Sequence, residues 1–143
     1  MKYGMEDSFL EKFYYINMRQ QEFIKGRLKT IKLGITQART IHFIGLNPGT
    51  IQKDLANYLG MQHASVTNLL KNLEQNGYIT RKIPEDNERQ KNLYLTKKGV
   101  EDAQKVQEIF YDLEGKIGEN ISLTEKNQLM ETLKKVDTTL GTV

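Results

Sequence analysis

The sequence predicts a mainly α fold with a small β-wing, and three observations lead to it. First, apolar residues three and four positions apart give Gln62–Gly77 one apolar helical face. These residues are Val66, Leu69, Leu70 and Leu73. Second, two short β-branched or alternating runs follow this helix and are typical of a hairpin. Third, apolar stripes recur over residues 7–31 and 97–140. The sequence therefore predicts a winged helix-turn-helix lobe over residues 34–98, flanked by N- and C-terminal dimerisation helices.

The composition fits one globular domain and excludes several classes of protein. At 143 residues, the chain is expected to form a single domain, 1–143. The absence of cysteine excludes disulfides, thiolate metal sites and thiol redox switches. No apolar run is long enough to cross a bilayer, and the charged start MKYGMEDSFLEKF lacks the apolar core of a secretory signal. We therefore expect a cytoplasmic protein that makes no membrane contact.

The positive charge is concentrated in the first two thirds of the chain. Residues 1–98 hold 16 Lys and Arg against 9 Asp and Glu, whereas residues 99–143 hold 5 against 9. The balances are thus +7 and −4, within a net charge of +3. A one-sided basic excess is what a polyanionic partner requires. The alternative is that any division of a charged chain produces some asymmetry.

The first segment, Asp7–Ile31, is predicted to be one long amphipathic helix. Its stripe, with steps of four and three, comprises Phe9, Phe13, Ile16, Gln20 and Phe23. This helix is longer than a small domain needs. We therefore expect it to pack against another chain as well as its own.

Two short helices are expected before the polar-faced helix Gln62–Gly77. Thr36 is the expected N-cap of a helix that ends at Ile44, and Thr50 is the expected N-cap of a helix over Ile51–Leu59. A short helix, a turn that contains glycine and a second helix with a polar face form the helix-turn-helix arrangement. Gly77 is expected to end the second helix in a left-handed conformation.

A hairpin and two further helices complete the chain. Strands are predicted over Tyr78–Ile83 and Lys91–Thr96, with Leu93 and Leu95 inward and a polar turn between them. Thr96 should cap a long helix to Ile117, and the last helix should run over Glu125–Leu140, capped by Ser122 or Thr124. Burying the long apolar stripes is expected to need a second copy related by a two-fold axis, which predicts a homodimer.

Three motifs in residues 50–99 resemble those of one known family. The first is the helical run Gln52–Ala56, and the second is the pattern of Val66, Thr67, Leu69, Leu70, Leu73, Glu74, Gly77, Tyr78 and Ile79. The third is the wing, with Asp86, Arg89, Leu93, Leu95, Thr96 and Gly99. Together they resemble the DNA-binding lobe of MarR-type (multiple antibiotic resistance regulator) transcription factors. The resemblance implies an obligate dimer, recognition helices in successive major grooves and wing arginines in minor grooves. It also implies a cleft between the dimer helices and each lobe that takes an effector.

One departure from the family pattern lies at the start of the predicted recognition helix. The family often has Ser or Asp there, where this chain has Gln62 followed by His63. Because glutamine is a poor N-cap, the first turn of this helix is expected to be less well fixed.

The face opposite the apolar stripe of Gln62–Gly77 is polar or cationic, and such side chains bond base edges or phosphates. The alternative is a surface helix that is simply hydrated. The expected DNA contacts are Thr50, Lys53, Gln62, His63, Ser65, Thr67, Asn68 and Lys71 on the helices, and Arg81, Arg89 and Lys91 in the wing. Two of these have open alternatives, since Lys53 can be merely solvated and Arg89 can pair with Asp86.

Asn17, Arg39 and His42 lie on the segments expected to line an effector pocket. The alternative for His42 is a helix residue whose ring bonds a backbone carbonyl. We expect no metal site, because neither His42 nor His63 has a carboxylate or cysteine at ligand spacing. No phosphate loop, metalloprotease motif or nucleophile motif is present, so neither an enzyme nor a cofactor is expected.

The predicted function is sequence-specific binding of double-stranded DNA by a homodimer at a pseudo-palindromic operator. Repression is the commoner outcome for such regulators, and a small-molecule effector would modulate it. The alternative function is a winged-helix protein-interaction module that binds no DNA.

Overall fold

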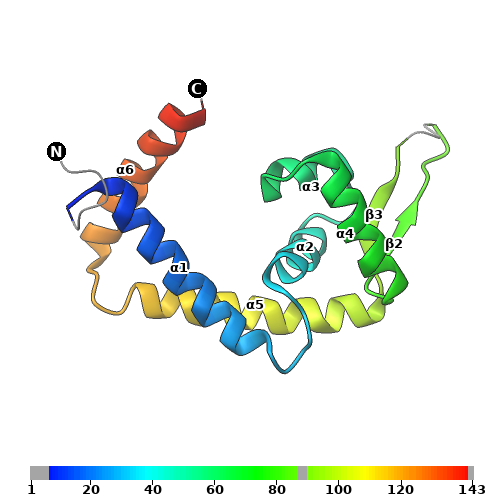
Figure 1. Ribbon diagram of the computed structural model, residues 1–143, viewed down its shortest axis with the longest axis horizontal. Coiled ribbons are helices and arrows are strands. Elements are labelled where there is room, and N and C mark those ends of the chain that lie inside the picture. The colour runs from blue at the N-terminus through cyan, green and yellow to red at the C-terminus, as the bar shows by residue number, and fades with distance from the viewer. Residues whose placement is uncertain (1–6, 87–89, 142–143) are drawn as a thin grey trace. The chain divides into compact units, whose positions relative to one another are not determined.

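Helices dominate the computed structural model, which describes residues 7–86 and 90–141 (Figure 1). A small antiparallel sheet accompanies them, so the predicted mainly α fold with a β-wing is confirmed. The elements are α1 (Phe9–Leu28), α2 (Ile35–Leu46), β1 (Thr50–Ile51), α3 (Gln52–Leu59), α4 (His63–Gln75), β2 (Ile79–Lys82), β3 (Asn92–Leu95), α5 (Lys97–Ile117) and α6 (Leu123–Gly141). The chain divides into two compact units, Met1–Phe110 and Tyr111–Val143, and the division falls within α5. The single domain 1–143 and its lobe boundaries remain predictions.

The core of the first unit is built from the apolar faces that spacing predicts for the short helices, namely Ala38, Ile41 and Ile44 or Gly45 in the first, and Ile51, Leu55, Ala56 and Leu59 in the second. Figure 1 shows α2, α3 and α4 close together, with the β2–β3 hairpin beyond them. Residues that are fully buried there are Ala38, Ile41 and Ile44 of α2, Leu55 of α3, and Val66, Leu70 and Leu73 of α4. Burying such side chains is the main favourable contribution to folding. The polar face of α4 is therefore held in place by a core immediately behind it.

The sheet contains a strand that was not predicted. Its order is β1-β3-β2, and both pairings are antiparallel. The predicted N-cap role of Thr50 is wrong, because Thr50 pairs with Leu93 as a residue of β1. Helix α3 begins one residue later than expected, and its N-cap Ile51 makes no side-chain cap bond. The physical reason is that β-branched Thr50 and Ile51 suit a strand, and Asn92 and Leu93 offer them a partner.

The predicted N-cap at Thr36 is also wrong. Helix α2 begins at Ile35, and its N-cap is Gly34 in an extended conformation. The Gln37 side chain accepts a hydrogen bond from the Gly34 N–H at 2.9 Å, which fixes the entry into the helix without a threonine hydroxyl. Thr36 is thus the second residue of the helix.

Other predicted helix ends are confirmed. Gly77 adopts a φ of 79° after α4, in the left-handed region that favours glycine. The Thr96 hydroxyl accepts from the Gly99 N–H at 3.1 Å and so caps α5. Ser122 caps α6, since its hydroxyl accepts from the Glu125 N–H while the Glu125 carboxylate accepts from the Ser122 N–H, both at 3.1 Å.

The buried face of α5 differs from the stripe that spacing predicts, which is Val100, Ala103, Val106, Phe110, Leu113 and Ile117. Val100 is exposed, whereas Gly99, Ala103, Val106 and Ile109 are buried. Gly99 approaches the backbone of Tyr78 so closely that this side of the helix faces the lobe. Leu93 is buried as predicted, but Leu95 is only half-buried.

Large apolar side chains remain exposed on each unit. In the first unit most of them lie along the N-terminal half of α1 and are Phe9, Leu10, Phe13, Tyr14, Tyr15, Ile16 and Met18, and the others are Leu46, Tyr58, Ile83 and Val100. In the second unit they are Tyr111, Ile117, Leu123, Leu129, Met130 and Leu140. Helix α6 has no buried residue. None of the helices in the described part of the chain is both long and apolar enough to span a bilayer.

Candidate nucleic-acid interface

Helix α4 separates its apolar and polar residues onto opposite faces. Most of the predicted DNA-contacting side chains on this helix and at its N-cap are exposed, namely Gln62, His63, Ser65, Asn68 and Lys71. Thr67 is half-buried at the edge of this face. None of these side chains is acidic. We call the five exposed residues the α4 polar face.

A groove of about 490 Å³ borders the start of α4. Its lining residues come from β1, α3, α4, β2 and the segment just before β3 and are Ile51, Gln52, Lys53, His63, Thr67, Arg81, Gln90 and Lys91. Five of the predicted DNA contacts thus lie on one groove, although they are far apart in the sequence. Three of these five are Lys or Arg, and none of the described residues that line the groove is acidic. We call it the basic groove.

Arg81 lines the basic groove, but most of its side chain is buried. Its side chain is only 13% exposed, and its Nε lies 3.4 Å from a carboxylate oxygen of Glu74. This contact is an ion pair without hydrogen-bond geometry, because Arg81 Nε and Nη2 are buried and have no hydrogen-bond partner in the described part of the structure. Glu74 therefore offsets part of the charge of Arg81, and the more exposed Lys53 and Lys91 provide the accessible positive charge.

Two further predicted contacts have different settings. Thr50 is half-buried in β1, where its backbone pairs with Leu93. Arg89, the residue expected to enter a minor groove, lies outside the described residues. The expectation for Arg89 therefore stays a prediction.

Sequence reasoning missed Gln52, the first residue of α3. Its amide nitrogen lies 2.7 Å from the Thr67 hydroxyl oxygen and 3.2 Å from the His63 carbonyl oxygen. The Thr67 hydroxyl in turn donates to the same carbonyl at 3.0 Å. Thr67 thus uses its hydroxyl hydrogen within the protein. Nothing in the local sequence pattern signals this role, because the contact joins two helices.

The residues predicted for an effector pocket are only partly brought together. Arg39 and His42 both lie against the Phe110 ring, with the Arg39 Cζ 5.3 Å and the His42 ring centroid 4.9 Å from its centroid. Arg39 Nη1 also donates to the Tyr58 hydroxyl at 3.3 Å. Asn17 is an exposed residue of α1 and has no contact with this cluster among the interactions described. The His42 ring packs edge-to-face on an aromatic ring instead of meeting a backbone carbonyl.

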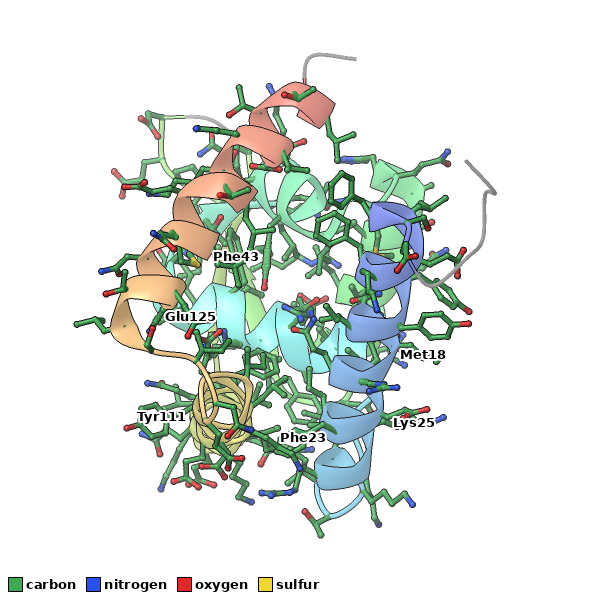
Figure 2. All side chains as sticks on the ribbon, turned by 90° about the vertical axis from the view of Figure 1, so that its left-hand side faces the viewer. Met18, Phe23, Lys25, Phe43, Tyr111 and Glu125 are labelled. Carbon is green, nitrogen blue, oxygen red and sulfur yellow. The ribbon has the colours of Figure 1, made fainter. Side chains whose placement is uncertain are left out.

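A second groove, of about 680 Å³, lies between α1 and the start of α2. Its lining includes Met18, Lys25, Lys29 and Lys32, but none of the three predicted effector residues. Figure 2 shows Met18 and Lys25 on one side of α1 and Phe23 on the other, so the groove lies on the side away from Phe23.

Burial, and secondly the charge of Arg39, lowers the pKa of His42 below its ordinary value of 6.5. The unfolded chain therefore takes up a proton at higher pH than the folded chain does, and His42 contributes stability that is lost as the pH falls below 6.5. We expect His42→Gln to make the free energy of unfolding less dependent on pH between pH 7.5 and 5, measured by urea unfolding. A difference between the two proteins that is constant over this range would contradict the prediction.

Comparison with known proteins shows which proteins this chain is similar to. The model of the MarR family matches residues 31–90, which contain α2, α3, α4 and the β2 strand. The HTH-type transcriptional regulator BilQ of Clostridium symbiosum is 27% identical over 138 residues, covering 94% of each chain. The chain is therefore similar to MarR-family regulators. The resemblance in residues 50–99 is thereby confirmed.

Solved structures similar to this chain include two that contain DNA. The complex of Staphylococcus aureus MepR with DNA has a TM-score of 0.86 and 25% identity, and the match covers 94% of this chain and 98% of MepR. A putative MarR-family regulator of Listeria monocytogenes in complex with a 26mer DNA has a TM-score of 0.86 and 26% identity, covering 95% and 90%. The match thus extends over the helices outside residues 31–90 as well.

Proposed function

We propose that this chain is a MarR-family regulator that binds double-stranded DNA sequence-specifically through the α4 polar face. The observation that carries the proposal is the exposed, acid-free face of α4 beside the basic groove. The two similar regulators solved in complex with DNA support it. The same face gives no support to the alternative function as a protein-interaction module.

The α4 polar face offers the chemistry of base recognition. An α-helix fits the major groove, and Gln or Asn can donate to and accept from adenine at the same time. Gln62 and Asn68 are the candidates for this readout, and Ser65 can bond any base edge. Lys71, together with Lys53 and Lys91 of the basic groove, would contact phosphates, which make up half or more of such interfaces.

The proposal includes a homodimer on a pseudo-palindromic operator. The exposed apolar residues of α1 and of α6 are large, and a soluble chain seldom leaves so many uncovered. An isologous interface built from these helices would present two copies of α4 to half-sites about 34–36 Å apart. Repression in the cytoplasm, by occupation of the operator, is the mode of action that we propose.

An effector is part of the same proposal. The Arg39–His42–Phe110 cluster joins α2, which lies in the core of the lobe, to α5, so a ligand there would act on both. It would release DNA only if it binds more tightly to dimers whose lobes are spaced wrongly for the operator. Asn17, Arg39 and His42 remain the proposed contacts.

The function is tested by selecting DNA from a random-sequence pool and measuring mobility shifts at graded salt. A protein that makes 6–10 phosphate contacts is expected to lose about 10³–10⁵ in affinity between 50 and 200 mM salt. We expect one selected motif with two inverted halves and a steep loss of binding with salt. Selection of no motif, or binding insensitive to salt, would contradict the proposed function.

The dimer is tested by the mass in solution. We expect sedimentation equilibrium to give twice the mass of one chain, and Phe13→Asp to shift the protein toward the monomer because it puts a charge into the proposed interface. Lys12→Asp is the control, since Lys12 is a neighbouring exposed residue that is already charged. A wild-type protein that sediments as a monomer at micromolar concentration would exclude the proposed dimer.

A further inference from the structure

One side-chain amide connects α3 to the first turn of α4. Nε2 of Gln52 lies within hydrogen-bond distance of the Thr67 hydroxyl oxygen and the His63 carbonyl oxygen, and 3.3 Å from Nε2 of the His63 ring. His63 and Thr67 are four residues apart, so they stand one above the other on the helix. A single amide therefore reaches both residues at one edge of the α4 polar face.

The orientation of this amide follows from Thr67. The Thr67 hydroxyl donates its only hydrogen to the His63 carbonyl, so its oxygen can only accept from Gln52. A carbonyl oxygen also only accepts. The atom of Gln52 that faces both must therefore be the amide nitrogen, which carries two hydrogens.

The same contact bears on where the proton of His63 lies. An N–H at Nε2 of the ring would face the Gln52 amide nitrogen, which carries hydrogens and accepts none, so this 3.3 Å contact favours an Nε2 without a hydrogen. A neutral imidazole has one N–H group, which is then at Nδ1. The exposed His63 thus offers a hydrogen-bond donor, at Nδ1, to whatever approaches the start of α4.

Among the described residues, Gln52 is the side chain from outside α4 that is hydrogen-bonded to its first turns. Gln62 occupies the N-cap, and its side chain makes no cap hydrogen bond, as expected from the weak capping of glutamine. Gln52 is half-buried and its amide is turned to α4. It is therefore placed to act through its neighbours, not by contacting DNA itself.

We propose that Gln52 is a positioning residue for DNA recognition, which holds His63 in the Nδ1–H tautomer at the edge of the α4 polar face. His63 would then donate to an acceptor on DNA, either a phosphate oxygen or an acceptor atom of a base edge in the major groove. This inference rests on the DNA-binding function proposed above. It assigns Gln52 a role that depends on the hydrogen bond and not on packing.

The tautomer is measured by two-bond ¹H–¹⁵N correlation spectra of the histidine rings at pH 8, without DNA. The chain has two histidines, so spectra of His42→Gln assign both. We expect the Nδ1–H pattern for His63 in the wild type and a shift toward Nε2–H in Gln52→Met, which keeps the length but donates nothing. Gln52→Glu, with a carboxylate that only accepts, should move the proton to Nε2. Unchanged His63 signals in both variants would overturn the proposal.

The effect on recognition is measured with the DNA fragment that the wild type selects from a random pool. We expect Gln52→Met to weaken binding about tenfold, the size expected for loss of one well-formed hydrogen bond. Gln104→Met, the same change at an exposed position of α5, should bind like the wild type. Because Gln52 acts through His63, the double variant Gln52→Met/His63→Ala should bind no more weakly than His63→Ala alone.

Two results would overturn the proposal at this stage. Additive losses in the double variant would mean that Gln52 contacts DNA directly, and unchanged affinity of Gln52→Met would mean that the tautomer does not matter for recognition. A wild-type protein that selects no DNA would overturn the proposed function and this inference with it. Normal selection with an unchanged tautomer would overturn the inference alone.

Discussion

Asn68→Asp is expected to abolish binding to the selected DNA fragment while leaving the dimer intact. Asn68 is exposed in the middle of the α4 polar face, and the substitution keeps its shape. It removes the two amide donors and brings a negative charge toward base edges and phosphates. Loss of one bidentate base contact costs about 1–3 kcal/mol, and the added repulsion should bring the total loss to at least about a hundredfold.

A matched variant tests whether the loss of binding depends on where the negative charge is placed. Asn120→Asp makes the same change at an exposed position in the turn between α5 and α6, and we expect it to bind DNA like the wild type. Mobility shifts at fixed salt compare the three proteins, and sedimentation checks their mass. If Asn68→Asp holds the fragment as tightly as the wild type, the α4 polar face does not read the DNA.

Gly99→Ala is expected to destabilise the lobe strongly. A Cβ at Gly99 would overlap the Tyr78 carbonyl oxygen and lie 3.2 Å from side-chain atoms of Leu95. The Tyr78 carbonyl is already fixed, because it accepts from the Thr96 N–H at 3.0 Å. Either α5 or the strand end must shift, and overpacking of this kind costs about 1–3 kcal/mol. Thermal unfolding followed by circular dichroism should therefore show a midpoint several degrees lower.

The control for Gly99→Ala lies on the same helix. A Cβ at Gly115 meets nothing within 4 Å, so Gly115→Ala should raise stability by about 0.5–1 kcal/mol, as alanine does in helices. The two substitutions are chemically the same and are expected to act in opposite directions. A Gly99→Ala protein as stable as the wild type would show that Tyr78 and Gly99 are not in close contact.

Local spacing was sufficient to predict most of the helices and the hairpin. The apolar residues of α2 and α4 repeat every three or four positions, and all those found fully buried had been assigned to the inner face. The ends of elements depended on more distant residues. Thr50 was expected to cap a helix because threonine does so locally, but its strand partner Leu93 is 43 positions away in the sequence.

The candidate site, like the ends of the elements, could be predicted only in part from local spacing. The exposed polar side chains of α4 follow directly from the position of its apolar face. The basic groove does not, since it needs β1, α3, α4, β2 and the residues just before β3 to meet. The amide of Gln52 and the cluster of Arg39 and His42 on Phe110 were equally hidden, because each joins residues on different helices.

The two-residue strand β1 has a mechanical consequence. It runs directly into α3 and pairs with β3, so the base of the hairpin and the helix-turn-helix are joined by backbone hydrogen bonds. The paired part of the hairpin is therefore expected to move together with α3 and not independently of it. We expect little ordering at this joint when DNA binds, and weaker binding of DNA whose grooves do not match the separation between α4 and the hairpin base.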